Sequence, residues 1–183
     1  SVTFGNNQFV AVANSSSTAA TSPDGITWTT RTLPSSANWW AVTYGNGVYV
    51  ATANGSTAAR STDGITWTSQ TLPASANWLS VAYGNGTFVA IPNVGITAAT
   101  STDGISWSGQ SMPVSQGWNA VAYGNGIFVA VAGSSITAAT STDGISWVSQ
   151  SMPSASPWSA LAYGNGLFVS VCGGGSSVGA VTP

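Results

Sequence analysis

The chain is built from one internal repeat of 39 or 40 residues. Its clearest landmark is the stretch Ser61-Thr62-Asp63-Gly64-Ile65-Thr66-Trp67, which returns almost unchanged at 101–107 and 141–147, and with a proline at 22–28. A second landmark, an aromatic residue followed by Gly-Asn, begins at Phe4, Tyr44, Tyr83, Tyr123 and Tyr163. Self-similarity at a fixed period of this length is typical of solenoids and propellers. We number the repeats 1 to 5, as roughly 1–38, 39–77, 78–117, 118–157 and 158–183.

A full repeat contains four short runs with strand-like composition. In repeat 3 the predicted strands are Trp78–Tyr83, Thr87–Ile91, Ile96–Thr100 and Ile105–Gln110. Asn85-Gly86 between the first two runs predicts a tight hairpin, because Asn and Gly tolerate positive φ. No segment has sustained helical periodicity. A connector containing a proline, such as Pro34 or Pro73, leads to the next repeat, and we expect it to end the outer strand.

Four-stranded units that recur about every 40 residues predict an all-β protein, a β-propeller of about five blades with the first and last incomplete. A β-solenoid is the alternative, although its coils are usually shorter and lack such hairpins. Residues 1–183 are expected to form a single propeller domain or a segment of a larger propeller. The ring could be five-bladed with a defective last blade, part of a larger ring, or completed by a second chain.

The four carboxylates of the chain all occupy the same position of the repeat, so a role for one must suit all. An Asp that enters a tight turn can accept hydrogen bonds from backbone N–H groups just ahead of it, and the following Gly supplies the left-handed residue. The Trp three residues beyond this Gly is expected to be buried between neighbouring repeats. We therefore predict structural roles for Asp24, Asp63, Asp103 and Asp143, and for Trp28, Trp67, Trp107 and Trp147.

The stretch Ser-Thr-Asp-Gly-Ile-Thr-Trp resembles the Asp box, the repeat of bacterial neuraminidases. That resemblance implies a propeller in which the motif forms the turn between the third and fourth strands of a blade. The repeats are also similar to those of bacteriophage tail and bacterial surface proteins, which implies an extracellular or virion-surface location.

Composition argues against several functions. The chain has two arginines, no Lys, no Glu and no His, and charged residues make up 3% of it. Nucleic-acid binding needs several Lys or Arg to neutralise phosphates. The resemblance to neuraminidases would imply a cluster of arginines and a Tyr–Glu pair in the active site. With two arginines and no Glu, this chain lacks them, so a degenerate sialidase-like hydrolase is a less favoured alternative. We expect no catalytic residues, no cofactor and no metal site. No run approaches the roughly 18 apolar residues of a membrane span, and we expect no membrane insertion.

The remaining candidates are binding residues. A Trp begins the inner strand of repeats 2 to 5, and each could stack on a sugar ring or form core. Trp40 is the best single candidate, because other repeats have Leu79, Asn119 or Ser159 there. Arg31 and Arg60 also depart from the repeat, and each could contact a ligand or only solvent. The candidate ligand-binding set is Trp40, Trp39, Trp78, Trp118, Trp158, Asn38, Asn77, Arg60 and Arg31.

These features predict a non-enzymatic surface binding or attachment module. Repeated Trp, Asn and Ser at the junctions between repeats suit multivalent recognition of surface glycans, as part of a phage tail or cell-surface assembly. The alternative is a purely structural subunit without a ligand. A nearly neutral chain has little charge repulsion to keep copies apart, so other chains of a larger assembly are expected partners.

Overall fold

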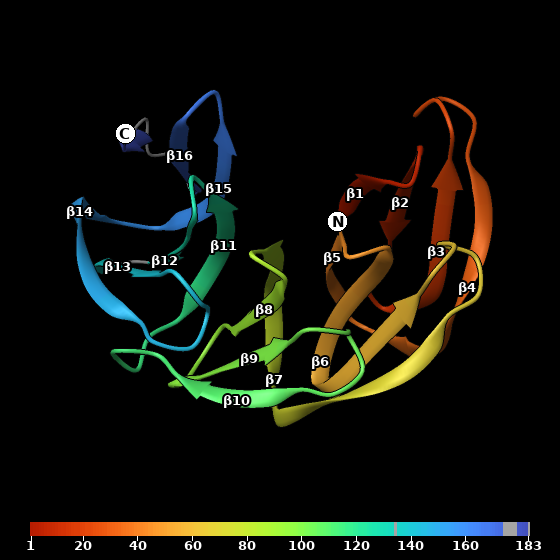
Figure 1. The fold of residues 1–183 in the computed structure, drawn as a ribbon, viewed down its shortest axis with the longest axis horizontal. Helices are drawn as coiled ribbons and strands as arrows, with labels where there is room; N and C mark the ends of the chain where they lie inside the picture. The colour runs from red at the N-terminus through yellow and green to blue at the C-terminus, as the bar shows by residue number, and fades with distance from the viewer. Residues whose placement is uncertain (134, 174–178, 183) are drawn as a thin grey trace.

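The computed structural model describes residues 1–133, 135–173 and 179–182, and the regular structure within them is entirely β-strand. Figure 1 shows the sheets following one another as an open arc, with the first and last sheets at its two ends. The strands that begin each repeat lie toward the centre of the arc, and β4, β10 and β14 lie at its rim. Within the described residues, no helix is long and apolar enough to span a membrane.

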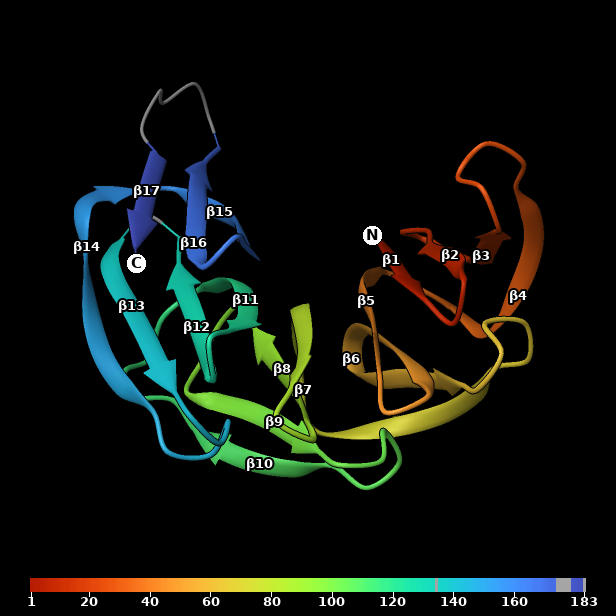
Figure 2. The same ribbon diagram turned by 45° about the horizontal axis from the view of Figure 1, so that its top comes forward.

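The strands follow the repeats. Repeat 1 contributes β1 (Val2–Gly5), β2 (Gln8–Val12), β3 (Ser16–Ser22) and β4 (Thr29–Ala37) as one sheet. Repeats 2 and 3 share a six-stranded sheet of β5 (Trp39–Gly45), β6 (Val48–Ser61), β7 (Thr68–Gly84), β8 (Thr87–Pro92), β9 (Thr97–Ser101) and β10 (Ser108–Ser111). Repeat 4 forms a sheet of β11 (Trp118–Gly124), β12 (Ile127–Ala132), β13 (Ser135–Ser141) and β14 (Val148–Ser156). In repeat 5, β15 (Trp158–Gly164), β16 (Leu167–Cys172) and β17 (Gly179–Thr182) form a three-stranded sheet, seen beside one another in Figure 2.

The pairing within each sheet is antiparallel between consecutive strands, as the four-stranded meander predicts. The predicted Asn-Gly hairpins are confirmed, since both residues have positive φ, 46° at Asn85 and 77° at Gly86. In repeat 1, Asn7 takes the place of this glycine with a φ of 58°. These turns connect the first and second strands of every repeat.

The predicted start of the fourth strand was wrong. We expected it at Ile105, but β10 begins at Ser108. The N–H groups of Ile105 and Ser106 bond the carboxylate of Asp103. Because these donors are used in the turn, they are not available to a β ladder, and pairing starts only after Trp107.

The expectation that the connector proline ends the outer strand was also wrong in three repeats. Strands β4, β7 and β14 continue past Pro34, Pro73 and Pro153. The ladder is interrupted locally: β3 pairs Thr18 with Thr32 and then Ser16 with Ala37. Proline therefore lies in an irregularity where no ladder donor is required.

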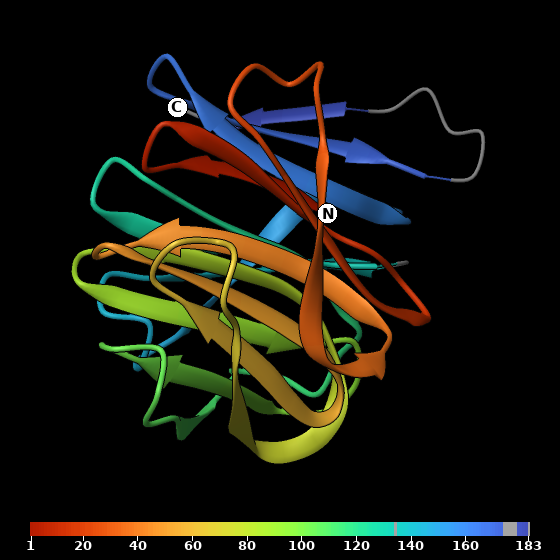
Figure 3. The same cartoon turned by 90° about the vertical axis from the view of Figure 1, so that its right-hand side faces the viewer.

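Successive sheets pack face to face through a junction that recurs along the arc, as the side view in Figure 3 shows for the first two repeats. Val10 of repeat 1 lies in one apolar cluster with Tyr49 and Trp67 of repeat 2. Val50 and Phe88, and then Val89 and Phe128, meet in the same way at the next two junctions. The core is thus a row of equivalent interfaces. Each one joins the face of one repeat that carries this valine, the valine face, to the face of the next repeat that carries Tyr49, Phe88 or Phe128, the aromatic face.

Candidate functional site

The Ser-x-Asp-Gly turn is a closed network of local hydrogen bonds. In repeat 4, the Ser141 hydroxyl donates to Asp143 Oδ1 (2.9 Å) and accepts from Gly144 N (2.8 Å). Asp143 Oδ1 also accepts from the N–H groups of Ile145 and Ser146, both at 2.8 Å. The turns at Asp24, Asp63 and Asp103 repeat these contacts. The carboxylates act as backbone acceptors, which is the structural geometry that the sequence predicted.

This hydrogen bonding lowers the pKa of all four carboxyl groups below their ordinary value of 3.8. The largest cause is a backbone N–H group: that of Thr27 for Asp24, Thr66 for Asp63, Ile105 for Asp103 and Ser146 for Asp143. A lowered pKa favours a fixed anion over a proton donor at neutral pH. The acids also lie apart, and among the described residues no group of three or more His, Cys, Asp or Glu could hold a metal ion.

The tryptophans of these turns lie between neighbouring repeats, except for the first. Trp67 is buried against the cluster that includes Val10, and Trp107 and Trp147 are partly buried in the next two junctions. Trp28 is 42% exposed, which contradicts the expectation of burial. Its ring lies beside that of Phe9, with 6.4 Å between the ring centroids, on a face of repeat 1 that none of the described repeats covers.

The four tryptophans that begin the inner strands of repeats 2 to 5 were considered above as ligand-binding residues. They are the most deeply buried large side chains. Their exposed fraction is 0–1% for Trp39, Trp78, Trp118 and Trp158. Trp39 Nε1 donates to Ser35 O at 3.2 Å, and Trp158 Nε1 to Ser154 O at 3.2 Å. A stacking ligand needs an exposed ring face, so this structure places all four residues in the core and not in a binding surface.

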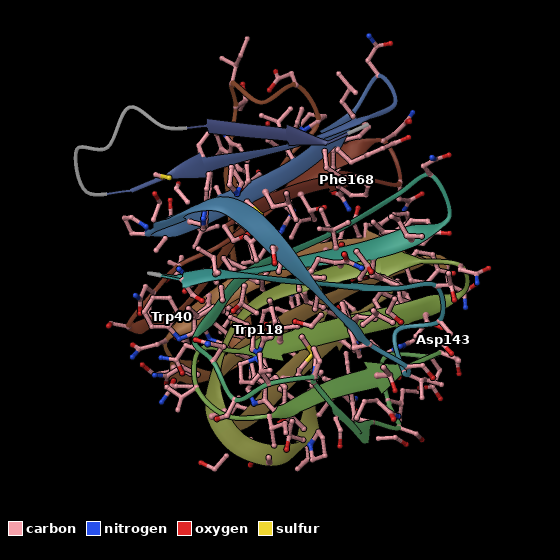
Figure 4. All side chains as sticks on the ribbon, turned by 90° about the vertical axis from the view of Figure 1, so that its left-hand side faces the viewer. Trp40, Trp118, Asp143 and Phe168 are labelled. Carbon is pink, nitrogen blue, oxygen red and sulfur yellow. The ribbon has the colours of Figure 1, made fainter. Side chains whose placement is uncertain are left out.

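Trp40 lies at the opposite end of the fold from the Asp turns, as its separation from Asp143 in Figure 4 shows. It is partly buried, and its Nε1 is shielded from solvent without a hydrogen-bond partner among the described residues. Its counterpart Asn119 donates instead to Trp158 O of the next repeat, at 2.7 Å. The exposed part of Trp40 is therefore hydrocarbon, which offers ring contact but no N–H donor.

The two candidate asparagines have different positions. Asn38 is partly buried, its N–H donates to Asn54 Oδ1 (2.8 Å), and its own Oδ1 accepts from Ser15 Oγ (2.8 Å). Asn77 is exposed within β7, and its carbonyl accepts from Asn93 N at 2.8 Å. Asn38 thus stabilises a connector, whereas the Asn77 side chain is open to solvent.

Neither arginine is simply solvated. Arg31 Nε donates to Thr21 Oγ1 at 3.1 Å, as Gln110 Nε2 does to Thr100 Oγ1 at 3.0 Å, so Arg31 replaces a structural glutamine. Arg60 Nε reaches across the junction and donates to Asp103 O of repeat 3 at 2.9 Å. At the junction before it, Gln8 Nε2 donates to the equivalent carbonyl of Asp63.

The structure reveals a groove that the sequence did not indicate. At the junction of repeats 3 and 4, on the side of the Asp turns, a depression of 320 Å³ is lined by Thr87, Thr100, Ser101, Thr102, Ser106, Ser108, Gln110 and Ile145. We call it the hydroxyl groove. Thr100 is the counterpart of Arg60, so the arginine side chain occupies the equivalent place one junction earlier. The only sequence signal was the Thr-for-Arg difference itself.

Comparison with solved structures places the fold among β-propellers. The virginiamycin B lyase from Staphylococcus aureus superposes with a TM-score of 0.86 at 16% identity, over 100% of this chain and 68% of that chain. A streptogramin B lyase gives 0.82 at 15% identity, over 93% and 61%. YCF48 bound to D1 peptide gives 0.73 at 19%, over 100% and 62%. The chain thus spans about three fifths to two thirds of their lengths, and identities this low show the fold alone.

None of the curated proteins matches this chain in sequence. The model of the DUF6242 beta propeller domain matches residues 1–116, which include the first two repeats, nearly all of repeat 3 and three of the four Asp turns. The recurring face-to-face junctions and antiparallel four-stranded sheets agree with that assignment. The chain belongs to the DUF6242 β-propeller domain family.

Proposed function

We propose that this protein is a non-enzymatic binding module that recognises surface glycans, and that the hydroxyl groove is its binding site. The observation that carries the proposal is the lining of this groove. Six Ser and Thr side chains line the groove, together with the Gln110 amide and the apolar Ile145. Hydroxyl and amide groups both donate and accept, as sugar hydroxyls require, and an apolar side chain suits the C–H face of a sugar ring.

The repeat gives such a site a natural multiplicity. In repeat 4, an equivalent depression of 290 Å³ is lined by Ile127, Thr140, Ser141, Thr142, Ser146 and Val148. Its isoleucine and valine stand where the hydroxyl groove has Thr87 and Ser108, so it is the more apolar of the two. Several weak sites on one rigid scaffold suit a surface that carries many copies of a ligand.

The chemistry of the side chains favours binding over catalysis. The four carboxylates are already committed to backbone N–H groups, with their pKa values lowered. The chain has no Glu, His or Lys that could act as a general base. We also propose that the Ser-x-Asp-Gly-x-x-Trp turn is an Asp box and that the repeats are about five blades with the first and last incomplete. In this proposal the module belongs to a phage-tail or cell-surface assembly.

The chain itself offers a matched pair of variants to test the site. Thr100→Arg copies the natural second junction, where Arg60 bonds the Asp carbonyl of the next repeat, and is expected to fill the hydroxyl groove without unfolding the protein. Arg60→Thr is expected to open a second groove. On a glycan array, Thr100→Arg should lose the wild-type signal, and Arg60→Thr should retain or increase it.

A Trp40→Ala variant tests the competing location on the other side of the fold. Loss of glycan binding in Trp40→Ala, with Thr100→Arg unaffected, would refute the groove and favour Trp40. If the folded wild-type protein binds no glycan on the array or in a monosaccharide thermal-shift screen, the glycan function is refuted. The purely structural role would then account for the protein.

A further inference from the structure

The first two junctions between repeats satisfy the same backbone carbonyl of the Asp turn with a side chain of the preceding repeat. At the junction of repeats 1 and 2, Gln8 Nε2 donates to Asp63 O at 2.6 Å. At the junction of repeats 2 and 3, Arg60 Nε donates to Asp103 O at 2.9 Å. Although the two donors come from different strands, each places a nitrogen at the carbonyl of the aspartate.

The Asp turn of repeat 4 lies against repeat 3 in the same way. A Cβ atom placed on Gly104 would lie 2.8 Å from Val50 Cγ2 of the preceding repeat. A Cβ atom placed on Gly144 would lie 2.5 Å from the equivalent Val89 Cγ2. The carbonyl of Asp143, which Figure 4 labels, therefore faces the preceding repeat as the carbonyl of the turn before it does.

The junction of repeats 3 and 4 lacks the nitrogen donor. The counterparts of Gln8 and Arg60 are Thr87 and Thr100, whose side chains carry no nitrogen. Within the described ranges of the chain, no group donates a hydrogen bond to Asp143 O. Both threonines line the hydroxyl groove, so this groove lies beside a backbone acceptor that is unpaired here and paired at the two other junctions.

The groove also offers a donor and an apolar contact. Thr100 Oγ1 accepts from Gln110 Nε2 at 3.0 Å. Because a hydroxyl group both accepts and donates, its proton remains available to an acceptor on a ligand. Ile145 is 51% exposed and lines the same groove. An acceptor, a donor and an apolar side chain therefore lie close together.

We propose that the hydroxyl groove selects N-acetylated amino sugars, with the acetamido N–H donating to Asp143 O and the acetamido carbonyl accepting from the Thr100 hydroxyl. This inference rests on the proposed glycan function and names the class of sugar. The acetamido group reproduces the amide of Gln8, and its methyl group would contact Ile145. A guanidinium or ammonium group can donate to the carbonyl, as Arg60 does, but neither can accept from a hydroxyl.

The test compares simple glycosides on the intact 183-residue protein. The probes are the methyl β-glycosides of N-acetylglucosamine and N-acetylgalactosamine, each against its parent hexoside, and methyl β-glucosaminide, titrated by NMR. At least one N-acetyl glycoside should bind tenfold or more tightly than its parent, because the parent leaves the carbonyl unpaired. Methyl β-glucosaminide should bind at least fivefold more weakly than its N-acetyl form, since it lacks the carbonyl.

Two substitutions at Thr87 locate the selectivity. Thr87→Gln copies Gln8 of repeat 1 and should supply an internal donor to Asp143 O. The ratio of N-acetyl to parent affinity should then fall at least fivefold. Thr87→Val is the matched control, because it copies Val48 of repeat 2 and removes the same hydroxyl without adding an amide. Its affinity ratio should equal that of the wild type.

The outcomes separate this inference from the glycan function itself. Equal binding of N-acetyl and parent glycosides, both abolished by Thr100→Arg, would refute the acetamido selection and leave the groove as a glycan site. Tighter binding of methyl β-glucosaminide than of its N-acetyl form would make the ligand a cation and refute it as well. An N-acetyl preference that folded Thr87→Gln leaves unchanged would rule out Asp143 O as the acceptor.

Binding of no glycan at all would refute the proposed function and this inference together. If circular dichroism shows that Thr87→Gln is unfolded, the comparison of the glycosides on the wild-type protein decides.

Discussion

The close approach of each repeat to the next can be tested at a single glycine. Gly84 ends β7, and a Cβ atom placed on it would lie 2.0 Å from Cγ of Tyr123 in the next repeat. Gly5, Gly45 and Gly124 have the same relation to the following tyrosine. Gly164, at the same position of repeat 5, has no atom within 4 Å of such a Cβ. The chain therefore contains both the crowded site and its open control.

The expected effect of Gly84→Ala follows from two opposing contributions. Alanine reduces the conformational entropy of the unfolded chain, which stabilises a protein by about 0.4–1 kcal/mol where the native backbone accepts it. Gly84 accepts it, because it is not among the positive-φ glycines, unlike Gly86. Forcing a methyl group into a packed interface costs about 1–3 kcal/mol, and a 2.0 Å approach lies at the severe end of that range. We expect a net loss of about 2 kcal/mol.

For Gly164→Ala only the entropic contribution remains, so the expected change is a gain of about 0.4–1 kcal/mol. For a chain of this size, 1 kcal/mol corresponds to roughly 2–4 °C in Tm. Gly84→Ala should therefore lower the Tm by about 4–8 °C, whereas Gly164→Ala should raise it slightly. Thermal melts by circular dichroism and urea titrations by tryptophan fluorescence measure both.

A double-mutant cycle assigns the loss to the tyrosine ring. In a Tyr123→Ala background the two nearest ring atoms are gone, so Gly84→Ala should cost clearly less than in the wild type. If Gly84→Ala and Gly164→Ala change stability equally, or if the cost of Gly84→Ala is the same without the Tyr123 ring, the account of the junction as a close aromatic–glycine contact is refuted.

Three further predictions concern the turns. Trp67→Ala should cost about 3–4 kcal/mol in the free energy of unfolding, whereas the exposed Trp28→Ala should cost less than about 1 kcal/mol; similar losses in urea titrations would contradict the junction packing. Asp103→Ala should destabilise by about 1 kcal/mol and leave glycan binding of the folded fraction intact, and lost binding at unchanged stability would instead make Asp103 a ligand residue. Because the folded carboxyl pKa values lie below 3.8, their contribution is complete above about pH 4 and is lost as the pH falls further; a Tm that is flat from pH 5 to pH 2 would contradict it.

Much of the local structure was predictable because it depends on residues close in sequence. The Asn85-Gly86 hairpin and the hydrogen bonding of Asp103 each involve atoms a few residues apart, and both were predicted. The start of the fourth strand was misplaced because the length of a turn depends on which N–H groups the carboxylate takes. The strand through Pro34 was missed because an irregularity in pairing, which no local pattern reveals, removes the need for its donor.

The candidate site was predicted less well. The repeat correctly singled out Arg60 as a departure, but its partner, the Asp103 carbonyl, lies 43 residues away. The groove at Thr100 exists only where two repeats meet. Trp39 and Trp40 are adjacent in sequence, yet one is fully buried and the other partly exposed, because neighbouring residues of a strand face opposite sides.

The sequence alone determined the unit of this protein: a four-stranded repeat, its two turn types and the roles of its glycines and aspartates. These follow from backbone dihedral preferences and short-range hydrogen bonds, which identical residues satisfy identically in every copy. Only the tertiary structure decided which faces are covered and which remain open. Trp67 and Trp28, or Val89 and Val129, occupy the same sequence position, and they differ because burial depends on whether a neighbouring repeat supplies the other half of the interface.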